Sequence, residues 1–91
     1  MKKEIEAKIT GRVQLVMFRD FVQRKSRGLS LLGFVQNIKD GSVYVVAQGD
    51  EESLAKLVEH LHKGSLLSRV DNVKVAWRSP TQEFRGFTIV Y

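Results

Sequence analysis

Apolar and polar side chains alternate from Glu4 to Thr10, near the start of the chain. Ile5, Ala7 and Ile9 share one face, and the polar residues between them share the other. Because successive side chains of a strand point to opposite faces, this period of two predicts a strand that is buried on one side only. We expect the polar residues, Glu4 included, to face solvent.

The period of the pattern changes at Phe18. Apolar and small residues then recur at the spacing of one helix face: Phe18, Val22, Ser26 and Leu29. This spacing predicts an amphipathic helix from Phe18 to about Gly28, with its stripe turned towards a core.

A second helix is predicted between Asp50 and Gly64. Asp50 can cap its N-terminus, and acidic residues fill its first turn. Gly64 can adopt a left-handed conformation at its C-terminus. The buried stripe of this helix would consist of Leu54, Leu57, Val58 and Leu61.

Residues 33–49 carry the clearest hairpin signal in the chain. Two runs of strand-forming residues flank Asp40-Gly41, a pair that tight hairpin turns favour because both central positions adopt positive φ. Two more strands are predicted further on, in residues 70–77 and 84–91. The apolar positions of the last strand fall in phase: Phe87, Ile89 and Tyr91.

The predicted order of elements is β-α-β-β-α-β. Two helices cannot bury their stripes on each other and also cover a sheet, so both are expected on one face of the sheet. The expected fold class is α+β, a ferredoxin-like sandwich with two helices on one face of a four- to five-stranded antiparallel sheet. The last two strands would form a hairpin or share the role of the fourth strand. Residues 1–91 would form a single domain, which suits this length.

Composition excludes several classes of protein. The chain has no cysteine, which excludes disulfides and thiolate metal sites. No apolar run follows the basic N-terminal residues, so no signal peptide is predicted. No apolar stretch approaches the roughly 20 residues that cross a bilayer. We expect a cytoplasmic protein without a membrane partner, acting as a monomer.

The formal net charge is +5, from 15 basic and 10 acidic residues, and it is unevenly placed. Residues 12–27 contain five basic side chains and a single acidic one, Asp20. Residues 50–63 instead have a small acidic excess. The positive field around residues 12–27 favours a small anionic substrate or a nucleic-acid backbone.

RNA binding is the alternative function from another class, since one large family of RNA-binding proteins has the same order of elements. Those proteins place exposed aromatic residues on their central strands. The corresponding strand here offers only Tyr44, and the run Arg85-Gly86-Phe87 belongs to the final strand instead. We therefore expect no nucleic-acid partner.

The usual catalytic groupings are not recognisable in the sequence. His60 and His62 lie about 200° apart around a helix, so they cannot share a metal ion. Asp20 and Asp40 have no evident carboxylate partner, and no histidine is placed to activate a serine. Any catalysis would therefore proceed without a nucleophilic side chain, a metal ion or an acid whose pKa is tuned by its surroundings.

Hydrolysis of an acyl phosphate can proceed without those groups. Its leaving group is a carboxylate, which is already stable as an anion and needs no general acid. The remaining tasks are to stabilise charge on the phosphoryl oxygens and to position a water molecule. Backbone N–H groups at a helix N-terminus and one arginine can perform the first task, and an amide side chain can perform the second.

Two blocks of the sequence match the pattern of a known family. The first runs from Gly11 to Arg19, where GRVQLVMFR corresponds to a glycine, two residues and then Gln-Gly-Val-x-Phe-Arg. The second is GFVQN in residues 33–37, followed by Asp40-Gly41, and it corresponds to Gly-aromatic-Val-x-Asn and Asp-Gly. With both blocks in this order, the chain resembles an acylphosphatase over essentially its whole length.

The resemblance implies hydrolysis of the carboxyl-phosphate bond of a small-molecule acyl phosphate, with inorganic phosphate as product and inhibitor and no metal or cofactor. It also implies two catalytic residues, Arg19 to bind the phosphoryl group and Asn37 to position the attacking water. The phosphate-binding loop that it implies consists of Gln14, Leu15, Val16, Met17, Phe18 and Arg19.

Leu15 stands where the family has glycine. A leucine with positive φ costs about 1–2 kcal/mol, and the loop stays open if its side chain points away from the phosphate. A reshaped loop would instead give the alternative function, a weakened or non-enzymatic phosphate-binding domain. Ser30 is a second departure, at the left-handed end of the first helix, where strain affects stability alone.

Overall fold

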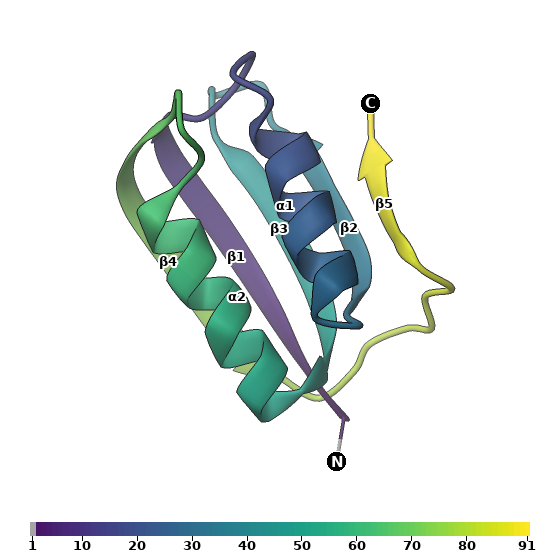
Figure 1. Cartoon of the computed structure of the whole chain (residues 1–91). Coiled ribbons are helices and arrows are strands. Elements are labelled where there is room, and N and C mark those ends of the chain that lie inside the picture. Colours follow the sequence, from purple (N-terminus) through teal and green to yellow (C-terminus); the bar gives the residue numbers. More distant parts are fainter. Residues whose placement is uncertain (1) are drawn as a thin grey trace.

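The computed structural model describes residues 2–91. Its elements follow one another in the order β-α-β-β-α-β-β (Figure 1). Their bounds are β1 Lys2–Arg12, α1 Phe18–Gly28, β2 Leu32–Asn37, β3 Val43–Asp50, α2 Glu51–Lys63, β4 Arg69–Arg78 and β5 Phe87–Val90. No helix within the described residues is long and apolar enough to cross a membrane.

The five strands form one sheet in the order β4-β1-β3-β2-β5. Neighbouring strands are antiparallel, except that β5 runs parallel to β2. The ferredoxin-like α+β class is confirmed. The fully antiparallel sheet and the pairing of the last two strands are wrong, because β4 and β5 lie at opposite edges. The eight residues 79–86 can span roughly 26 Å, which is enough for the roughly 19 Å across four inter-strand steps.

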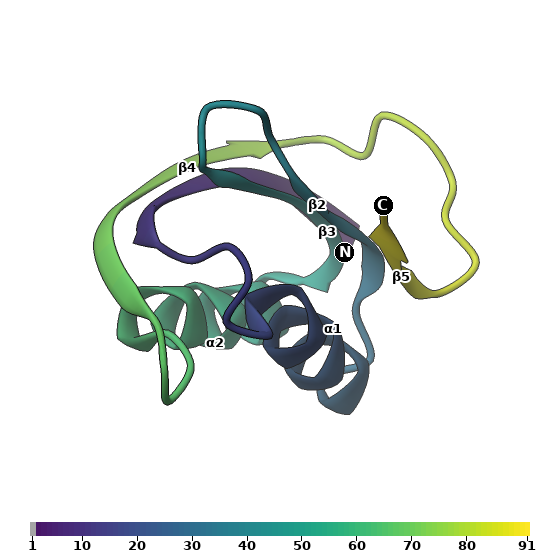
Figure 2. The same ribbon diagram turned by 90° about the horizontal axis from the view of Figure 1, so that it is seen from above.

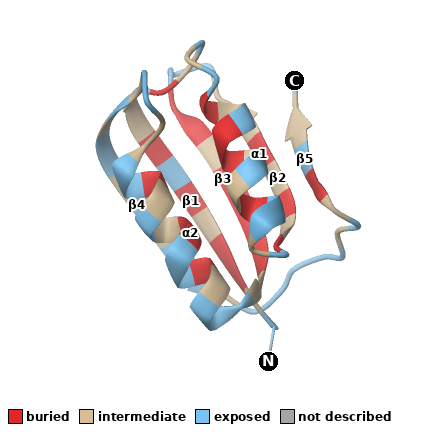
Figure 3. Cartoon of the chain, in the orientation of Figure 1, coloured by how far each residue is buried: buried red, intermediate tan, exposed pale blue. Residues whose placement is uncertain are grey.

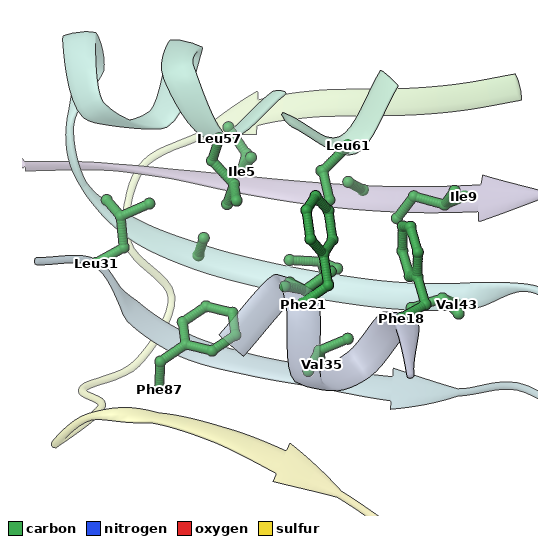
Figure 4. Packing of buried hydrophobic residues seen from close by; sticks show 14 of the residues in the cluster. Ile5, Ile9, Phe18, Phe21, Leu31, Val35, Val43, Leu57, Leu61 and Phe87 are labelled. Carbon is green, nitrogen blue, oxygen red and sulfur yellow. The ribbon is translucent and has the colours of Figure 1, made fainter. Parts of the chain in front are cut away.

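Both helices cover the same face of the sheet, as Figure 2 shows from above. Their apolar stripes pack on side chains of β1, β2 and β3 between the two layers (Figure 4). Figure 3 shows the same division, with buried residues on the central strands and on the helix sides that face them. Phe18 is 1% exposed, and fully burying a side chain of this kind contributes about 1.5–3 kcal/mol. This packing fixes the start of α1 against the sheet.

The helices begin and end close to their predicted positions. α1 spans Phe18–Gly28 as predicted, and it is followed by Ser30 with φ 59°. α2 begins directly after Asp50, but the side chain of Asp50 makes no capping hydrogen bond. Gly64 ends α2 with φ 73°, so the positive φ predicted there is confirmed.

The hairpin between β2 and β3 lies at the predicted place but has a longer turn. The N–H of Ile38 donates to the carbonyl of Ser42 (2.9 Å), and the N–H of Gly41 donates to the carbonyl of Ile38 (3.1 Å). Gly41 has φ 94°, whereas Asp40 does not have the predicted positive φ. Asp40 instead accepts hydrogen bonds from the N–H (2.9 Å) and hydroxyl (2.5 Å) of Ser42. The bond from Lys8 and those from Ser42 hold the pKa of Asp40 well below its usual range.

Glu4 is fully buried, although the alternation in β1 predicts that it faces solvent. The segment 79–86 crosses the sheet face that the helices leave free (Figure 2), and its residue Thr81 hydrogen-bonds to Glu4. The carboxylate accepts hydrogen bonds from Gln48 Nε2 (2.7 Å), Arg78 Nε (2.5 Å) and Thr81 Oγ1 (2.9 Å). Burial raises the pKa of Glu4, but these hydrogen bonds together outweigh burial and lower it below its ordinary value.

Glu4→Ala is expected to lower the free energy of unfolding by about 2–3 kcal/mol, because Gln48, Arg78 and Thr81 then lose the charged partner they share. Urea denaturation at neutral pH measures this loss. The pKa of Glu4 is lower in the folded chain than in the unfolded one. Its contribution is therefore present above the ordinary carboxyl pKa and is lost as the pH falls through the folded-state pKa.

Glu6→Ala is the matched control for Glu4→Ala. Glu6 also accepts a hydrogen bond from Arg78 (3.2 Å), but its side chain is 39% exposed. Because solvent screens such a pair, Glu6→Ala should cost less than about 1 kcal/mol. Equal losses in the two variants would show that the burial of Glu4 contributes nothing to stability.

Candidate active site

Three segments that are distant in the sequence meet at one end of the sheet: the β1–α1 loop, the end of β2 and the end of β5 (Figure 1). They border a hollow of about 160 Å³, which we call the loop hollow. It brings the two candidate catalytic residues, Arg19 and Asn37, to one place. The full lining consists of Val13, Leu15, Met17, Phe18, Arg19, Asp20, Asn37, Ile89 and Tyr91.

The β1–α1 loop has a backbone shape that suits an anion. Gly11 lies at a bulge in β1 with φ 129°, and a side chain there would collide with the backbone of Arg69. The bulge turns the chain out of the sheet and into the loop. Leu15 (φ 61°) and Met17 (φ 60°) are left-handed, with Val16 between them. Left-handed residues beside ordinary ones make successive N–H groups converge, as in an anion-binding nest.

The N–H groups of this loop are free to bind a ligand. Within the described chain, the backbone N–H groups of residues 14–19 donate to no other protein atom. A helix leaves its first N–H groups without helical partners, and a polar N-cap side chain usually satisfies one of them. The N-cap of α1 is Met17, whose side chain makes no capping hydrogen bond. The positive end of the helix dipole and these N–H groups together favour an anion here.

Arg19 lies in the first turn of α1 and is oriented by the last strand. Its Nη1 donates to the carbonyl of Val90 (3.4 Å), and its guanidinium carbon lies 4.8 Å from the centre of the Tyr91 ring. A carbonyl oxygen and the face of an aromatic ring both attract a cation. The sequence does not reveal this support, because Val90 lies 71 positions further along the chain.

Asn37 is the last residue of β2 and shares the helix-facing side of the sheet with the buried Val35. Its Oδ1 is buried, yet among the described residues it has no hydrogen-bond partner. Leaving such an acceptor unsatisfied costs about 1–3 kcal/mol, so a native chain retains one where a water or ligand uses it. Asn37 lines the loop hollow, so a water or ligand there can use this acceptor.

Two residues of the predicted phosphate-binding loop, Gln14 and Val16, support the loop hollow without lining it. Gln14 Nε2 donates to the carbonyls of Ile38 (2.7 Å) and Ser42 (2.8 Å), which ties the loop to the turn after Asn37. Val16 packs against the core. The loop and the end of β2 are therefore held at a fixed separation.

The groups around the loop hollow can bind an oxyanion and orient a water molecule. The loop N–H groups and the Arg19 guanidinium are donors, and Asn37 Oδ1 is an acceptor. Asp20 is the one carboxylate of the lining, and it lies 4.0 Å from Arg24. Within residues 2–91, no three histidine, aspartate or glutamate side chains are grouped as a metal site requires.

Leu15 does not fill the loop hollow. Its side chain is 96% exposed and that of Met17 is 73% exposed, so both extend into solvent at the rim. Leu15 has φ 61°, the strained conformation of the open loop, which is one of the two outcomes that the sequence leaves for this position. The same conformation at Met17 is not predictable from the sequence, because methionine gives no sign of it.

Leu15→Gly is expected to raise the free energy of unfolding by about 1 kcal/mol, because glycine adopts positive φ without strain. It should raise kcat/KM for benzoyl phosphate by less than about 10-fold, since the loop already has its open shape. Urea denaturation and steady-state kinetics measure the two effects.

Ser30→Gly is the matched control, because Ser30 has the same strain (φ 59°) far from the hollow. It should raise stability without changing kcat/KM. An unchanged or lower kcat/KM in Leu15→Gly would show instead that leucine is a native part of the loop.

A five-stranded sheet with two helices on one face defines a class, the small α+β proteins with a ferredoxin-like sandwich. Within that class, the family model of acylphosphatase matches residues 5–89. The chain belongs to the acylphosphatase family.

Relatives agree with this assignment over almost the whole chain. An acylphosphatase of Salinibacter ruber is 42% identical over 88 residues, which cover 97% of this chain and 93% of the relative. The crystal structure of acylphosphatase from Bacillus subtilis matches with a TM-score of 0.94 at 36% identity, covering 98% of this chain and 99% of that one. T. kodakarensis HypF also matches, with a TM-score of 0.84 and 31% identity, over 98% of this chain and 12% of HypF. The protein is an enzyme of acyl phosphate hydrolysis.

Proposed function

We propose that the protein hydrolyses the carboxyl-phosphate bond of small acyl phosphates at the loop hollow, releasing a carboxylate and inorganic phosphate. The N–H groups of residues 14–19 and the guanidinium of Arg19 bind the phosphoryl oxygens. Oδ1 of Asn37 accepts a hydrogen bond from the attacking water. The observation that supports this proposal most is the buried, unpartnered Oδ1 at the same hollow as Arg19.

The reaction needs positioning and charge stabilisation more than proton transfer by the protein. The water oxygen attacks phosphorus while the bond from phosphorus to the bridging oxygen breaks, and its electron pair leaves with the carboxylate. Because an amide is not basic, the proton of the water passes to a phosphoryl oxygen of the substrate. Arg19 and the N-terminus of α1 stabilise the charge on the equatorial oxygens.

The alternative, a weakened or non-enzymatic phosphate-binding domain, requires a loop that Leu15 has reshaped. The 96% exposure of Leu15 supports the open loop instead. Every group of the proposed site belongs to one chain, so we propose that the monomer is active. We also propose that it acts on a small acyl phosphate in the cytoplasm, without a nucleic-acid partner.

Benzoyl phosphate should be hydrolysed by the purified protein after treatment with a chelator, at the same rate as before treatment. Inorganic phosphate should inhibit competitively, because the product and the transferred group use the same donors. Release of benzoate measures both effects. Activity that disappears with the chelator and returns with magnesium would contradict the mechanism, as would phosphate inhibition that affects kcat alone.

A further inference from the structure

Exposed apolar side chains are concentrated around the loop hollow. Six large hydrophobic residues are prominently exposed in residues 2–91, and the hollow's own lining includes three of them: Leu15, Met17 and Tyr91. Leu66 and Leu67 are 97% and 68% exposed in the α2–β4 connection, which lies at the same end of the molecule (Figure 1). The sixth is Trp77, near the far end of β4. Such clustering indicates an apolar ligand beside the site.

A second hollow, which we call the side groove, adjoins the loop hollow. It has a volume of about 240 Å³ and lies between the start of α1 and the α2–β4 connection. Its apolar lining consists of Val16, Met17, Phe21, Leu66 and Leu67. Met17 and Asp20 line both hollows, so a molecule anchored in the loop hollow can extend past Met17 into the side groove.

We propose that the side groove binds the acyl group of the substrate, so that the enzyme favours acyl phosphates with a medium-length alkyl or aryl group over acetyl phosphate. This inference rests on the proposed function, which anchors the phosphoryl group at Arg19. Acetyl phosphate offers such a groove only a methyl group, whereas a longer acyl chain extends further from the phosphoryl group and carries more apolar surface.

The size and charge of the side groove favour an acyl group over a protein partner. A stable protein interface buries about 800 Å² on each partner, far more than a groove of about 240 Å³ can supply. The charged residues of the rim, Asp20 and Arg24, lie 4.0 Å apart and balance each other. An uncharged apolar occupant is therefore the one that suits the groove.

Alkylphosphonates that cannot be hydrolysed test the groove independently of catalysis. Each methylene that is fully buried strengthens binding about fourfold, and a half-open groove should give about twofold. From methylphosphonate to hexylphosphonate, affinity should rise by about 30-fold, as measured by calorimetry. The amide signals of Leu66 and Leu67 should shift with the longer ligand in NMR spectra.

The double variant Leu66→Ser/Leu67→Ser removes the exposed leucines and should reduce this 30-fold gain to about fivefold or less. Trp77→Ser is the matched control, because it removes an exposed apolar side chain outside both hollows, and it should retain the gain. Equal affinity for the two phosphonates would overturn the proposal. So would an unchanged gain in the double variant, or a concentration-dependent dimer that the double variant abolishes, since the groove would then bind a second copy.

Turnover separates failure of this inference from failure of the proposed function. The ratio of kcat/KM for hexanoyl phosphate to that for acetyl phosphate should exceed about 10 and should fall at least threefold in the double variant. If both substrates are hydrolysed and the ratio of their kcat/KM values is near 1, the side groove does not bind the acyl group, but the proposed function stands. Tight hexylphosphonate binding without hydrolysis of either substrate would overturn the proposed function and leave the groove supported.

Discussion

Arg19→Ala is expected to reduce kcat/KM for benzoyl phosphate by about 10³-fold, through both a higher KM and a lower kcat. The guanidinium contacts phosphoryl oxygens in the bound substrate and in the transition state, so its loss affects binding and chemistry together. The hydrogen bond from Arg19 to Val90 is long, at 3.4 Å, and contributes little to stability. Steady-state kinetics measures the loss, and circular dichroism verifies that the variant folds.

Arg27→Ala provides the control for charge. Arg27 is exposed in the last turn of α1, so its removal lowers the net charge by the same amount without altering the hollow. It should change kcat/KM less than about threefold. Arg19→Lys should recover only part of the activity, because an ammonium cannot bind two phosphoryl oxygens as a planar fork. Equal effects of the Arg19→Ala and Arg27→Ala variants would reduce the role of Arg19 to general electrostatic attraction.

Asn37→Ala is expected to lower kcat by about 10²-fold or more, with a much smaller change in the inhibition constant of inorganic phosphate. The amide orients the water and does not bind the phosphoryl group, which is why kcat and phosphate binding should separate. The fold should survive, because Oδ1 of Asn37 has no protein partner that its removal would leave unpaired.

Asn72→Ala is the control for Asn37→Ala, since Asn72 is an exposed amide in β4, away from the hollow. It should leave kcat unchanged. If Asn37→Ala instead hydrolyses benzoyl phosphate at the wild-type rate, another group holds the water.

The parts of the fold that local pattern determines were predictable from the sequence. The helical spacing from Phe18 gives α1 its bounds, and the alternation of Ile5, Ala7 and Ile9 gives β1 its core face. The family pattern places a glycine at position 15, which makes a strained Leu15 with positive φ one of two foreseeable outcomes, and the structure has that one. Each of these features depends on residues within a few positions of each other, so a short window of sequence contains the information.

Features that depend on distant segments were not predictable. Glu4 has the alternation of a solvent-facing residue, and only the later segment 79–86 explains its burial. The phase of Phe87 and Ile89 shows that a strand is present but not that it pairs with β2. For the same reason, the sequence places Arg19 at the helix start but does not reveal that Val90 and Tyr91 orient it.

The position of β1 inside the sheet has a consequence for how quickly the chain folds. Glu4 pairs with Gln48 on one side and with Arg78 on the other, so both partners of this strand arrive late in the sequence. Closing such long loops costs entropy before any contact forms, and folds dominated by distant pairings reach the native state in about milliseconds to seconds. During that interval both hydrogen-bonding edges of β1 are unpaired, and its apolar side chains are open to other unfolded chains. Dilute, cool refolding conditions therefore suit this protein better than concentrated ones.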